Sequence, residues 1–438
     1  MNIKVPASTN CPELRYSLEV LFNVFLGIDY KLTISDVANI TVCGSHKNLI
    51  IPSVFFSTLV YSGDSAYSVP TDVSKDTIII SEQVIDIVSI YGTSNISISE
   101  SEITLHSDIL ASTFFMLSRW EEYVDKTRDI YGRFPAKASL AYKAGFFDRP
   151  IVNEYVEFLW VLLQQIGCNQ KRKSRSYKLV PTHDVDKPYL FNGFGKGLKY
   201  VAGSLKRRRF SELERYANNV LKNSDPFDTH DHLMDLAELN NVEAHFFFLQ
   251  KGKSKPDEDH DIARGKIKKL AKHILNRGHD IGFHPSYDAF NDEYLFTKEK
   301  EYLELNFDLQ VDTGRHHFLK WDVSVTPQIW QMNNMKWDST LGYADRAGFR
   351  CGVCYPFPLY DLVNNKQLDV YERPLVAMEW SLIHYQRLTI DKAEEEIDKL
   401  KRQVKKYNGE FVFLYHNSAF FTDEYFGKSK RLLSAFYK

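Results

Sequence analysis

The sequence predicts an α/β protein whose C-terminal part holds a parallel sheet or barrel, preceded by a smaller mixed α/β domain. Two observations lead to this fold class. Beyond residue 176, apolar strands, polar turns and amphipathic helices alternate regularly, which is typical of βαβ proteins. Before it, short β-branched runs lie between stripes of apolar residues at helical spacing. At ~150 residues per domain, 438 residues make two or three domains.

The composition is that of a globular protein, with 44% hydrophobic and 26% charged residues. It excludes disordered, collagen-like and small disulfide-rich classes. The 55 basic and 57 acidic residues give a net charge of −2, so no global field draws the chain to nucleic acid. Five cysteines are too few and odd in number for a disulfide framework, which indicates a reducing compartment. We expect the lone pair Cys351 and Cys354 to be buried thiols rather than zinc ligands.

The N-terminal sequence MNIKVPASTNCPELRYS lacks the apolar segment of a secretory signal. The apolar stretches are interrupted by charges such as Glu154 and Glu157, and none approaches the ~18 residues of a membrane span. We therefore expect a cytoplasmic protein.

The N-terminal part, residues 1–170, reads as an accessory α/β domain. Residues 12–27 carry apolar side chains at helical spacing. Two β-rich runs follow, and then two helices that close the domain. The predicted strands are Thr77–Ile80 and Val84–Ile90, and the predicted helices are Asp108–Tyr123 and Asn153–Gln165.

Residues 168–176, CNQKRKSRS, have no hydrophobic pattern and read as a linker. We place the second domain, the expected catalytic one, at residues 176–438. Its predicted strands are Lys178–Thr182, Glu243–Leu249, Asp280–Phe283, Val311–Gly314, Asp369–Tyr371 and Glu410–Leu414, with helices such as Ile262–Asn276 and Ile390–Lys406 between them.

Candidate functional residues follow these strands, because α/β folds bind ligands at the carboxyl ends of strands. Asp184 and Asp186 end the first strand, and clustered carboxylates need a cation, an arginine or a shared proton. His284 ends the third strand, with Asp288 four residues on. His and Asp groups at two strand ends of one domain predict a metal site.

Two further strand ends add charge to the same edge. Arg315 and His317 follow the fourth strand, and His416 follows the last. An arginine holds a carboxylate well, and histidine is a general acid or a ligand. Together these residues suit metal-assisted hydrolysis, which needs a cation to activate water, a base and an acid.

The order Thr-x-Asp-x-Asp, Gly-His-Asp-Ile-Gly-x-His, Arg and Leu-x-His resembles the polysaccharide deacetylases of the NodB-like carbohydrate esterase group, over roughly residues 176–438. The resemblance implies a NodB-like distorted (β/α) barrel. Residues 338–343 and 348–350 also look like a bacterial subfamily with an added N-terminal domain, and residues 114–122 look like that domain.

Carried over by position, the resemblance implies that Asp184 is the general base, Arg315 its partner and His416 the general acid. Asp186 and His284 become metal ligands. The roles of Asp184 and Asp186 can be exchanged, because residues two apart in a strand point to the same side.

The second motif departs from the family, where a second histidine is usual. Asp288 stands in its place here, so the third ligand is Asp288, His317 or absent. The expected metal is zinc, with cobalt, manganese or nickel as alternatives, since Asp and His suit all of them. We expect His183, His245 and His316 to serve packing or to support the ligands.

The segment 189–223 interrupts the α/β rhythm and holds the basic run 206–209. It is either a solvated helical flap or a basic amphipathic helix that makes peripheral contact with an anionic membrane.

The sequence therefore predicts a metal-dependent hydrolase that removes an acetyl group from an N-acetylated or O-acetylated sugar. A non-catalytic glycan-binding relative with an incomplete metal site and an amidase acting on a small cyclic amide are the alternatives. The expected partner is a carbohydrate substrate, with no nucleic acid and no obligate protein partner.

Overall fold

The computed structural model describes residues 1–62, 68–80, 83–190, 201–222, 224–252, 254, 257, 260–421 and 428–438. The chain divides into two compact units. Unit 1 comprises Met1–Ser176, Phe349–Pro374 and Lys406–Gly409, and unit 2 comprises Tyr177–Gly348, Leu375–Lys405 and Glu410–Lys438. The predicted linker lies at the end of the first segment of unit 1. The two short later segments of unit 1 fall inside the range that the sequence boundary assigns to the catalytic domain.

Unit 1 contains a six-stranded mixed sheet in the order β2-β1-β3-β4-β8-β7, the two-stranded sheet β5–β6 and the antiparallel strands β14 and β15. Its strands are β1 (Asn2–Val5), β2 (Lys31–Ile34), β3 (Ile40–Cys43), β4 (Asn48–Ile51), β5 (Ser74–Ile80), β6 (Gln83–Ser89), β7 (Gly92–Ile98), β8 (Glu102–Ser107), β14 (Phe357–Asp361) and β15 (Lys366–Glu372). Its helices are α1 (Pro12–Leu18), α2 (Val54–Ser62), α3 (Ile109–Leu117), α4 (Trp120–Val124), α5 (Leu140–Lys143) and α6 (Ile151–Gln165), with shorter or π-helical turns η1 (Ala7–Thr9), η2 (Glu19–Leu26) and η4 (Ala136–Ala138).

The predicted elements of unit 1 are present. The helix expected over residues 12–27 is α1 continued by η2, and both predicted strands belong to β5 and β6. The helix expected over Asp108–Tyr123 is divided, because Arg119 takes a left-handed conformation with φ of 56° between α3 and α4. This break lets the buried guanidinium of Arg119 reach Glu122, with Nε to Oε1 at 2.9 Å.

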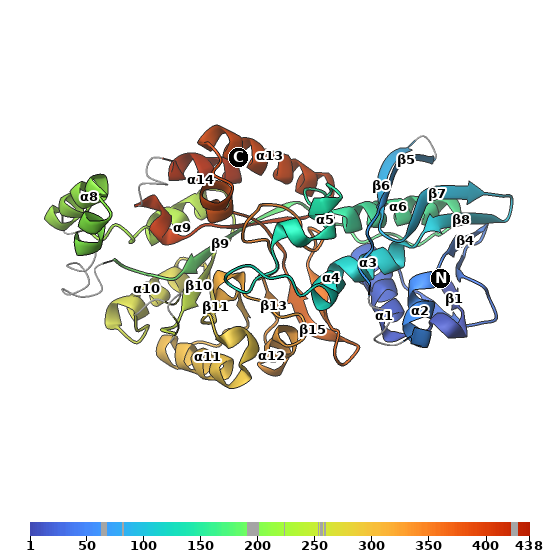
Figure 1. Ribbon diagram of the computed structural model, residues 1–438, viewed down its shortest axis with the longest axis horizontal. Helices are drawn as coiled ribbons and strands as arrows, with labels where there is room; N and C mark the ends of the chain where they lie inside the picture. The colour runs from blue at the N-terminus through green and yellow to red at the C-terminus, as the bar shows by residue number, and fades with distance from the viewer. Residues whose placement is uncertain are drawn as a thin grey trace. The chain divides into compact units, whose positions relative to one another are not determined.

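Unit 2 is an α/β unit built on a curled, half-barrel sheet in the order β13-β12-β11-β10-β9-β17-β16, in which neighbouring strands run parallel. Its helices lie around these strands (Figure 1). The strands are β9 (Lys178–Val185), β10 (His245–Leu249), β11 (Asp280–His284), β12 (Thr313–Gly314), β13 (Trp337–Asp338), β16 (Leu375–Met378) and β17 (Glu410–Leu414). The helices are α8 (Phe210–Leu221), α9 (His230–Leu239), α10 (Gly265–Asn276), α11 (Glu293–Phe307), α12 (Thr326–Met332), α13 (Ile390–Lys406) and α14 (Ser429–Tyr437), with turns η5 (Ala289–Asn291), η6 (His317–Leu319), η7 (Ser381–Tyr385) and η8 (Asn417–Phe420).

The central strands of unit 2 are apolar and buried, as expected for a parallel sheet covered on both faces. All five residues of β10 and of β17 are buried. The pairing aligns Leu249 with His284 and Leu414 with Thr182, so the strands end at the same edge. Gly314 permits the close approach of β12 to β11, because a Cβ atom there would lie 2.0 Å from the Phe283 carbonyl oxygen.

One predicted strand runs antiparallel to a neighbour. The strand expected at Asp369–Tyr371 is present as part of β15, which pairs antiparallel with β14, and both strands fall in unit 1. Asn365, with φ of 49°, lies in the short connection between the two strands, and a tight hairpin requires such a residue. The periodicity of a short strand does not reveal the direction of its partner, so the sequence did not predict this antiparallel pairing.

The basic segment is described in part, since residues 191–200 and 223 of the predicted insertion lie outside the described residues. Residues 206–209 are exposed, as are Leu205 and Phe210, at 52% and 64%. A turn at Arg208, with φ of 58°, separates the helical residues 201–206 from α8, so the basic run lies at the end of one helix and before another. Contact with a membrane stays a prediction.

The cysteines agree with the sequence analysis. All five are free thiols, and Cys351 and Cys354 are buried. Within the described ranges, no helix combines the length and apolar character needed to cross a membrane.

Candidate functional site

The carboxyl ends of neighbouring parallel strands in unit 2 bring distant residues to one edge of the sheet. The central strand β9 contributes Asp184 and is followed by Asp186, and β11 ends at His284. Arg315 and His317 follow β12, whereas Glu379 follows β16 and His416 follows β17 after one residue. The residues that the sequence analysis placed at the ends of strands therefore lie at one end of the sheet, and the strand order explains why they meet there.

Asp186, His284 and His317 form a group with the geometry of metal ligands. One atom from each residue lies within 4.8 Å of the other two. Asp186 Oδ1 is 3.2 Å from His284 Nε2 and 3.7 Å from His317 Nε2. One carboxylate and two imidazoles are a common ligand set for zinc and related divalent cations.

Hydrogen bonds on the far side of each ring orient both histidines toward Asp186. His284 Nδ1 lies 2.5 Å from the carbonyl oxygen of Arg315, and His317 Nδ1 lies 2.8 Å from Oδ1 of the buried Asp257. A carbonyl oxygen only accepts hydrogen bonds, so Nδ1 of His284 donates and Nε2 carries the lone pair when the ring is neutral. Metal-bound histidines are typically held in this way.

The side chains of Asp186, His284 and His317 are better satisfied with a bound cation than without one. Asp186 Oδ1 and His284 Nε2 are buried, face each other and lack a hydrogen bond within the described part of the chain. Burial by itself would raise the pKa of Asp186, but His317, His284 and His416 lower it well below its usual range. Burial disfavours the charged form of His284, yet Asp184 and Asp186 raise its pKa above the ordinary value. The site therefore stabilises a positive charge between these residues, which a proton or a metal ion can supply.

Arg315 fixes one oxygen of Asp184. The guanidinium is fully buried, and its Nη1 donates to Asp184 Oδ1 and to Thr182 Oγ1, both at 2.9 Å. Its Nε and Nη2 donate to the carbonyl and hydroxyl oxygens of Ser339. The second oxygen of Asp184, Oδ2, lies 3.7 Å from His284 Nε2 and so faces the metal-ligand group.

Glu379 holds His416. Its Oε1 lies 2.6 Å from His416 Nδ1 and 3.2 Å from the backbone nitrogen of the same residue. Glu379 is fully buried. Burial lowers the pKa of His416, but the charge and hydrogen bond of Glu379, followed by the charges of Asp186 and Asp184, outweigh this and raise the pKa to about 10. His416 is therefore protonated at neutral pH, with Nε2 3.8 Å from Asp186 Oδ2.

The sequence analysis missed Glu379. Its signal was an acidic residue directly after the apolar run Leu375–Met378, which is strand β16 and was not predicted. In the structure Asp338 Oδ1 accepts hydrogen bonds from the backbone nitrogen and hydroxyl of Thr340, at 3.1 and 2.5 Å.

Asp288 lies outside the metal-ligand group, and its carboxylate accepts a hydrogen bond from the Ser254 hydroxyl. The structure thus places His317 of the next strand end, rather than Asp288, beside Asp186 and His284.

The histidines expected to support packing do so. His316 packs against Phe296 and Trp330, with ring centroids 5.7 and 5.6 Å away. His183 Nδ1 bonds the Tyr415 carbonyl oxygen at 2.8 Å. His245 Nδ1 lies 2.9 Å from Asp280 Oδ2. These two residues and Glu243 form a second group of acids and histidine, located where β10 and β11 begin and thus at the other end of the strands from His284.

Comparisons with known proteins give a partial picture. Residues 1–167 match a family of unknown function, DUF7033. No curated protein matches the chain. Similar solved structures include a protein assigned as a polysaccharide deacetylase from Mycobacterium smegmatis, at 17% identity and a TM-score of 0.40 over 60% of this chain and 83% of that chain.

Two further structures were found. A mutant of a CE4 family pseudoenzyme with restored enzymatic activity is 12% identical, with a TM-score of 0.28 over 60% of this chain and 63% of that chain. PuuE allantoinase is 9% identical, with a TM-score of 0.32 over 46% of this chain and 64% of that chain. Similarities this low do not transfer an activity.

Proposed function

We propose that the chain is a metal-dependent hydrolase that removes an acetyl group from an N-acetylated or O-acetylated sugar of a polysaccharide or its precursor. The proposal rests on three groups that lie together at one edge of the unit 2 sheet. They are the ligand atoms of Asp186, His284 and His317, the Asp184 carboxylate bound by Arg315, and the His416 imidazole bound by Glu379. Acetylated sugars are the substrates that the motif order of the sequence favours.

Asp186, His284 and His317 would hold the metal, which, when bound, polarises the acetyl carbonyl and makes water more acidic. The choice of His317 rests on its 3.7 Å separation from Asp186 Oδ1. Asp186 acts as a ligand rather than a base, because its Oδ1 lies 3.2 Å from His284 Nε2, nearer than Asp184 Oδ2 at 3.7 Å, and also lies 3.7 Å from His317 Nε2.

Asp184 acts as the general base. Arg315 occupies its Oδ1, so Oδ2 is the atom that takes the proton of the attacking water. The buried guanidinium also holds this carboxylate in one orientation, which is what a base needs before each turnover.

His416 acts as the general acid. Glu379 binds its Nδ1, so Nε2 carries the proton that goes to the departing amine or alcohol. Asp184, the base, lies in β9, and His416, the acid, follows the neighbouring strand β17, so both lie beside the ligand group. One residue takes up a proton while the other gives one away.

The test combines metal analysis with an acetate-release assay on the full chain. Wild-type protein, stripped and reconstituted with zinc, cobalt or manganese, should hold about one metal ion per chain. It should also release acetate from N-acetylated or O-acetylated oligosaccharides. His317→Ala should lose both properties, whereas the matched variant Asp288→Ala should keep its metal.

Other outcomes separate the alternatives. A protein that binds no metal under any of these conditions would be a glycan-binding relative with an incomplete site. A protein that binds metal but opens small cyclic amides, and releases no acetate from sugars, would be an amidase.

A further inference from the structure

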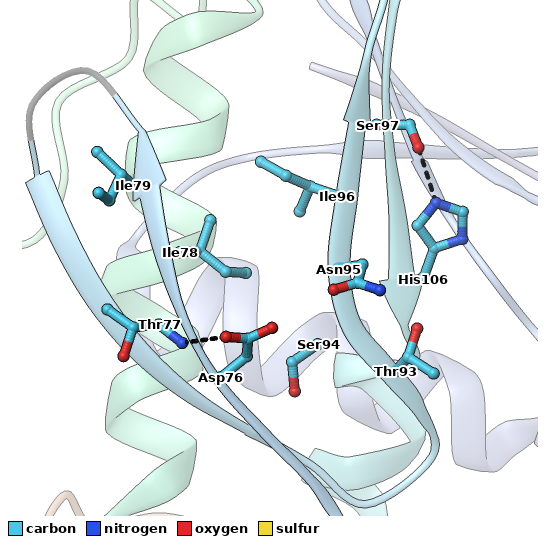
Figure 2. A pocket seen from close by; sticks show the side chains of 10 residues that line it. All are labelled: Asp76, Thr77, Ile78, Ile79, Thr93, Ser94, Asn95, Ile96, Ser97 and His106. Atoms are coloured by element: carbon cyan, nitrogen blue, oxygen red, sulfur yellow. Dashed lines mark hydrogen bonds between the residues drawn. The ribbon is translucent and has the colours of Figure 1, made fainter.

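Unit 1 contains two pockets that share one residue, His106 of β8. The first has a volume of about 440 Å³ and is lined by Phe55, Tyr91 and Asp108, among others. The second has a volume of about 600 Å³ and lies between β5 and β7 (Figure 2). Neither pocket belongs to the site in unit 2.

Two residues that line the first pocket, Tyr91 and Asp108, each have a buried polar atom without a hydrogen bond in the described chain. Asp108 is 3% exposed and caps α3, with Oδ1 accepting a hydrogen bond of 2.8 Å from the Ala111 backbone nitrogen. Its other oxygen, Oδ2, and the hydroxyl of Tyr91 make no hydrogen bond in the described chain. Buried polar atoms are stabilised by a hydrogen-bond partner, so a ligand that reaches these two atoms would gain from bonding to them.

The electrostatics of Asp108 agree with this. Burial raises its pKa to about 7, against the opposing effect of backbone hydrogen bonds from Ala111 and Leu110. The helix cap thus stabilises the carboxylate only in part. A ligand hydroxyl or amine that donates to Oδ2 would supply the missing interaction.

An aromatic surface adjoins these polar atoms. The Phe55 ring is held among other rings, with centroids 4.9 Å from Tyr91 and 5.8 Å from Trp120. A sugar ring has an apolar face of C–H groups and a rim of hydroxyls, so a fixed aromatic ring beside hydrogen-bonding groups is suited to it.

The second pocket has a polar lining. Its lining includes Asp76 of β5 and Ser94 of β7 beside the apolar Ile78 and Ile96, and Figure 2 shows these four side chains between the two strands. Ser97 Oγ lies 2.9 Å from Nε2 of His106, which connects this lining to the first pocket. Hydroxyl, amide and carboxylate side chains in a row can bind the hydroxyl groups of successive sugar units.

We propose that unit 1 binds an oligosaccharide, with one sugar unit against Phe55 and Asp108 and the adjoining units along the polar pocket between β5 and β7. The choice of a glycan rests on the proposed function, because unit 1 would then bind the same polymer that unit 2 hydrolyses. The alternative occupant is an extended peptide that adds to the β5 and β7 edges. A peptide held by main-chain bonds would leave Asp108 Oδ2 and the Tyr91 hydroxyl unpaired, so the glycan is favoured.

The test measures binding in the absence of catalysis. Full-length His416→Ala protein, treated with chelator, is titrated calorimetrically with N-acetylated and deacetylated chito-oligosaccharides of one to six units. We expect affinity to rise with length. Tyr91→Phe and Asp108→Asn should each weaken binding about tenfold or more, since each removes a hydrogen bond to the ligand while Asn keeps the helix cap.

The matched control is Tyr155→Phe. The Tyr155 hydroxyl is also buried in unit 1 but donates to the Val88 carbonyl oxygen. Its loss should lower the melting temperature and leave binding unchanged, whereas Tyr91→Phe should leave the melting temperature unchanged or raise it.

Two results would overturn the proposal. One is oligosaccharide binding that Tyr91→Phe and Asp108→Asn do not affect. The other is the absence of oligosaccharide binding, with or without binding of an extended (Thr-Val)₃ peptide. Because the metal is removed, a failure here is distinct from a failure of acetate release by the wild-type enzyme.

Discussion

Oε1 of Glu379 lies 2.6 Å from Nδ1 of His416, and this pair joins residues that are 37 positions apart. Glu379 is fully buried, so its charge acts on the imidazole with little screening by water. The pair fixes both the orientation of the His416 ring and the nitrogen that can deliver a proton.

We therefore expect Glu379→Gln to lower kcat for acetate release by about 10²-fold or more, within the range that general acid catalysis contributes. KM and metal content should change little, because the carboxylate is not part of the ligand group. Steady-state kinetics with metal analysis check this. A variant with wild-type kcat would show that Glu379 does not position the acid.

The bond between His317 and Asp257 leads to a second prediction. Asp257→Asn weakens the acceptor on His317 Nδ1, and loss of such a partner typically lowers metal affinity 10- to 100-fold. Chelator competition measures the affinity. Asp280→Asn is the control. It alters a similar acid–histidine pair, in which Asp280 Oδ2 lies 2.9 Å from His245 Nδ1 at the other end of the strands, and it should leave the metal affinity unchanged. Equal losses in both variants would contradict the assignment of His317 as a ligand.

Arg315 leads to a third prediction. Its planar guanidinium reaches Asp184, Thr182 and Ser339 at once, and a lysine ammonium cannot reproduce that fork. Arg315→Lys should keep the positive charge and the metal, yet lower kcat/KM by about 10²-fold through misplacement of the base. Retained activity with retained metal would mean that charge alone suffices.

The fourth prediction concerns stability in unit 1. Glu122 is buried between two arginines, with Oε2 2.6 Å from Arg350 Nη2 and Oε1 2.9 Å from Arg119 Nε. Burial would raise the pKa of Glu122, but Arg350 and Arg119 lower it from 4.5 to about 2. Glu122→Gln removes the negative charge that these two buried guanidinium groups share, so the free energy of unfolding at neutral pH should fall by about 3–5 kcal/mol.

The pH dependence of this effect follows from the direction of the pKa shift. A carboxyl whose pKa is depressed by folding stabilises the native state above its unfolded pKa of 4.5, and that contribution is lost as the pH falls toward about 2. Urea titrations at several pH values should show the difference between wild type and Glu122→Gln shrinking in this window. The exposed Glu100, changed to Gln, is the control and should show no such trend.

The sequence by itself determined the elements of unit 2 that carry the site. The apolar runs and their breakers predicted β9, β10, β11 and β17, because a buried parallel strand needs an unbroken apolar segment. Parallel strands end at one edge, so Asp184, His284 and His416 were predicted to lie together. Both inferences depend on local pattern alone.

The tertiary structure alone decided which residues from different segments become neighbours. The presence of His317 rather than Asp288 beside Asp186 depends on how the chain leaves β11 and β12. Glu379 follows a four-residue strand whose burial is visible only in the sheet. The β15 segment joins unit 1 through an antiparallel partner, β14. In each case the physical reason is the same: a side chain's partners in a folded protein come from segments distant in the sequence, and their proximity is fixed by packing and strand pairing.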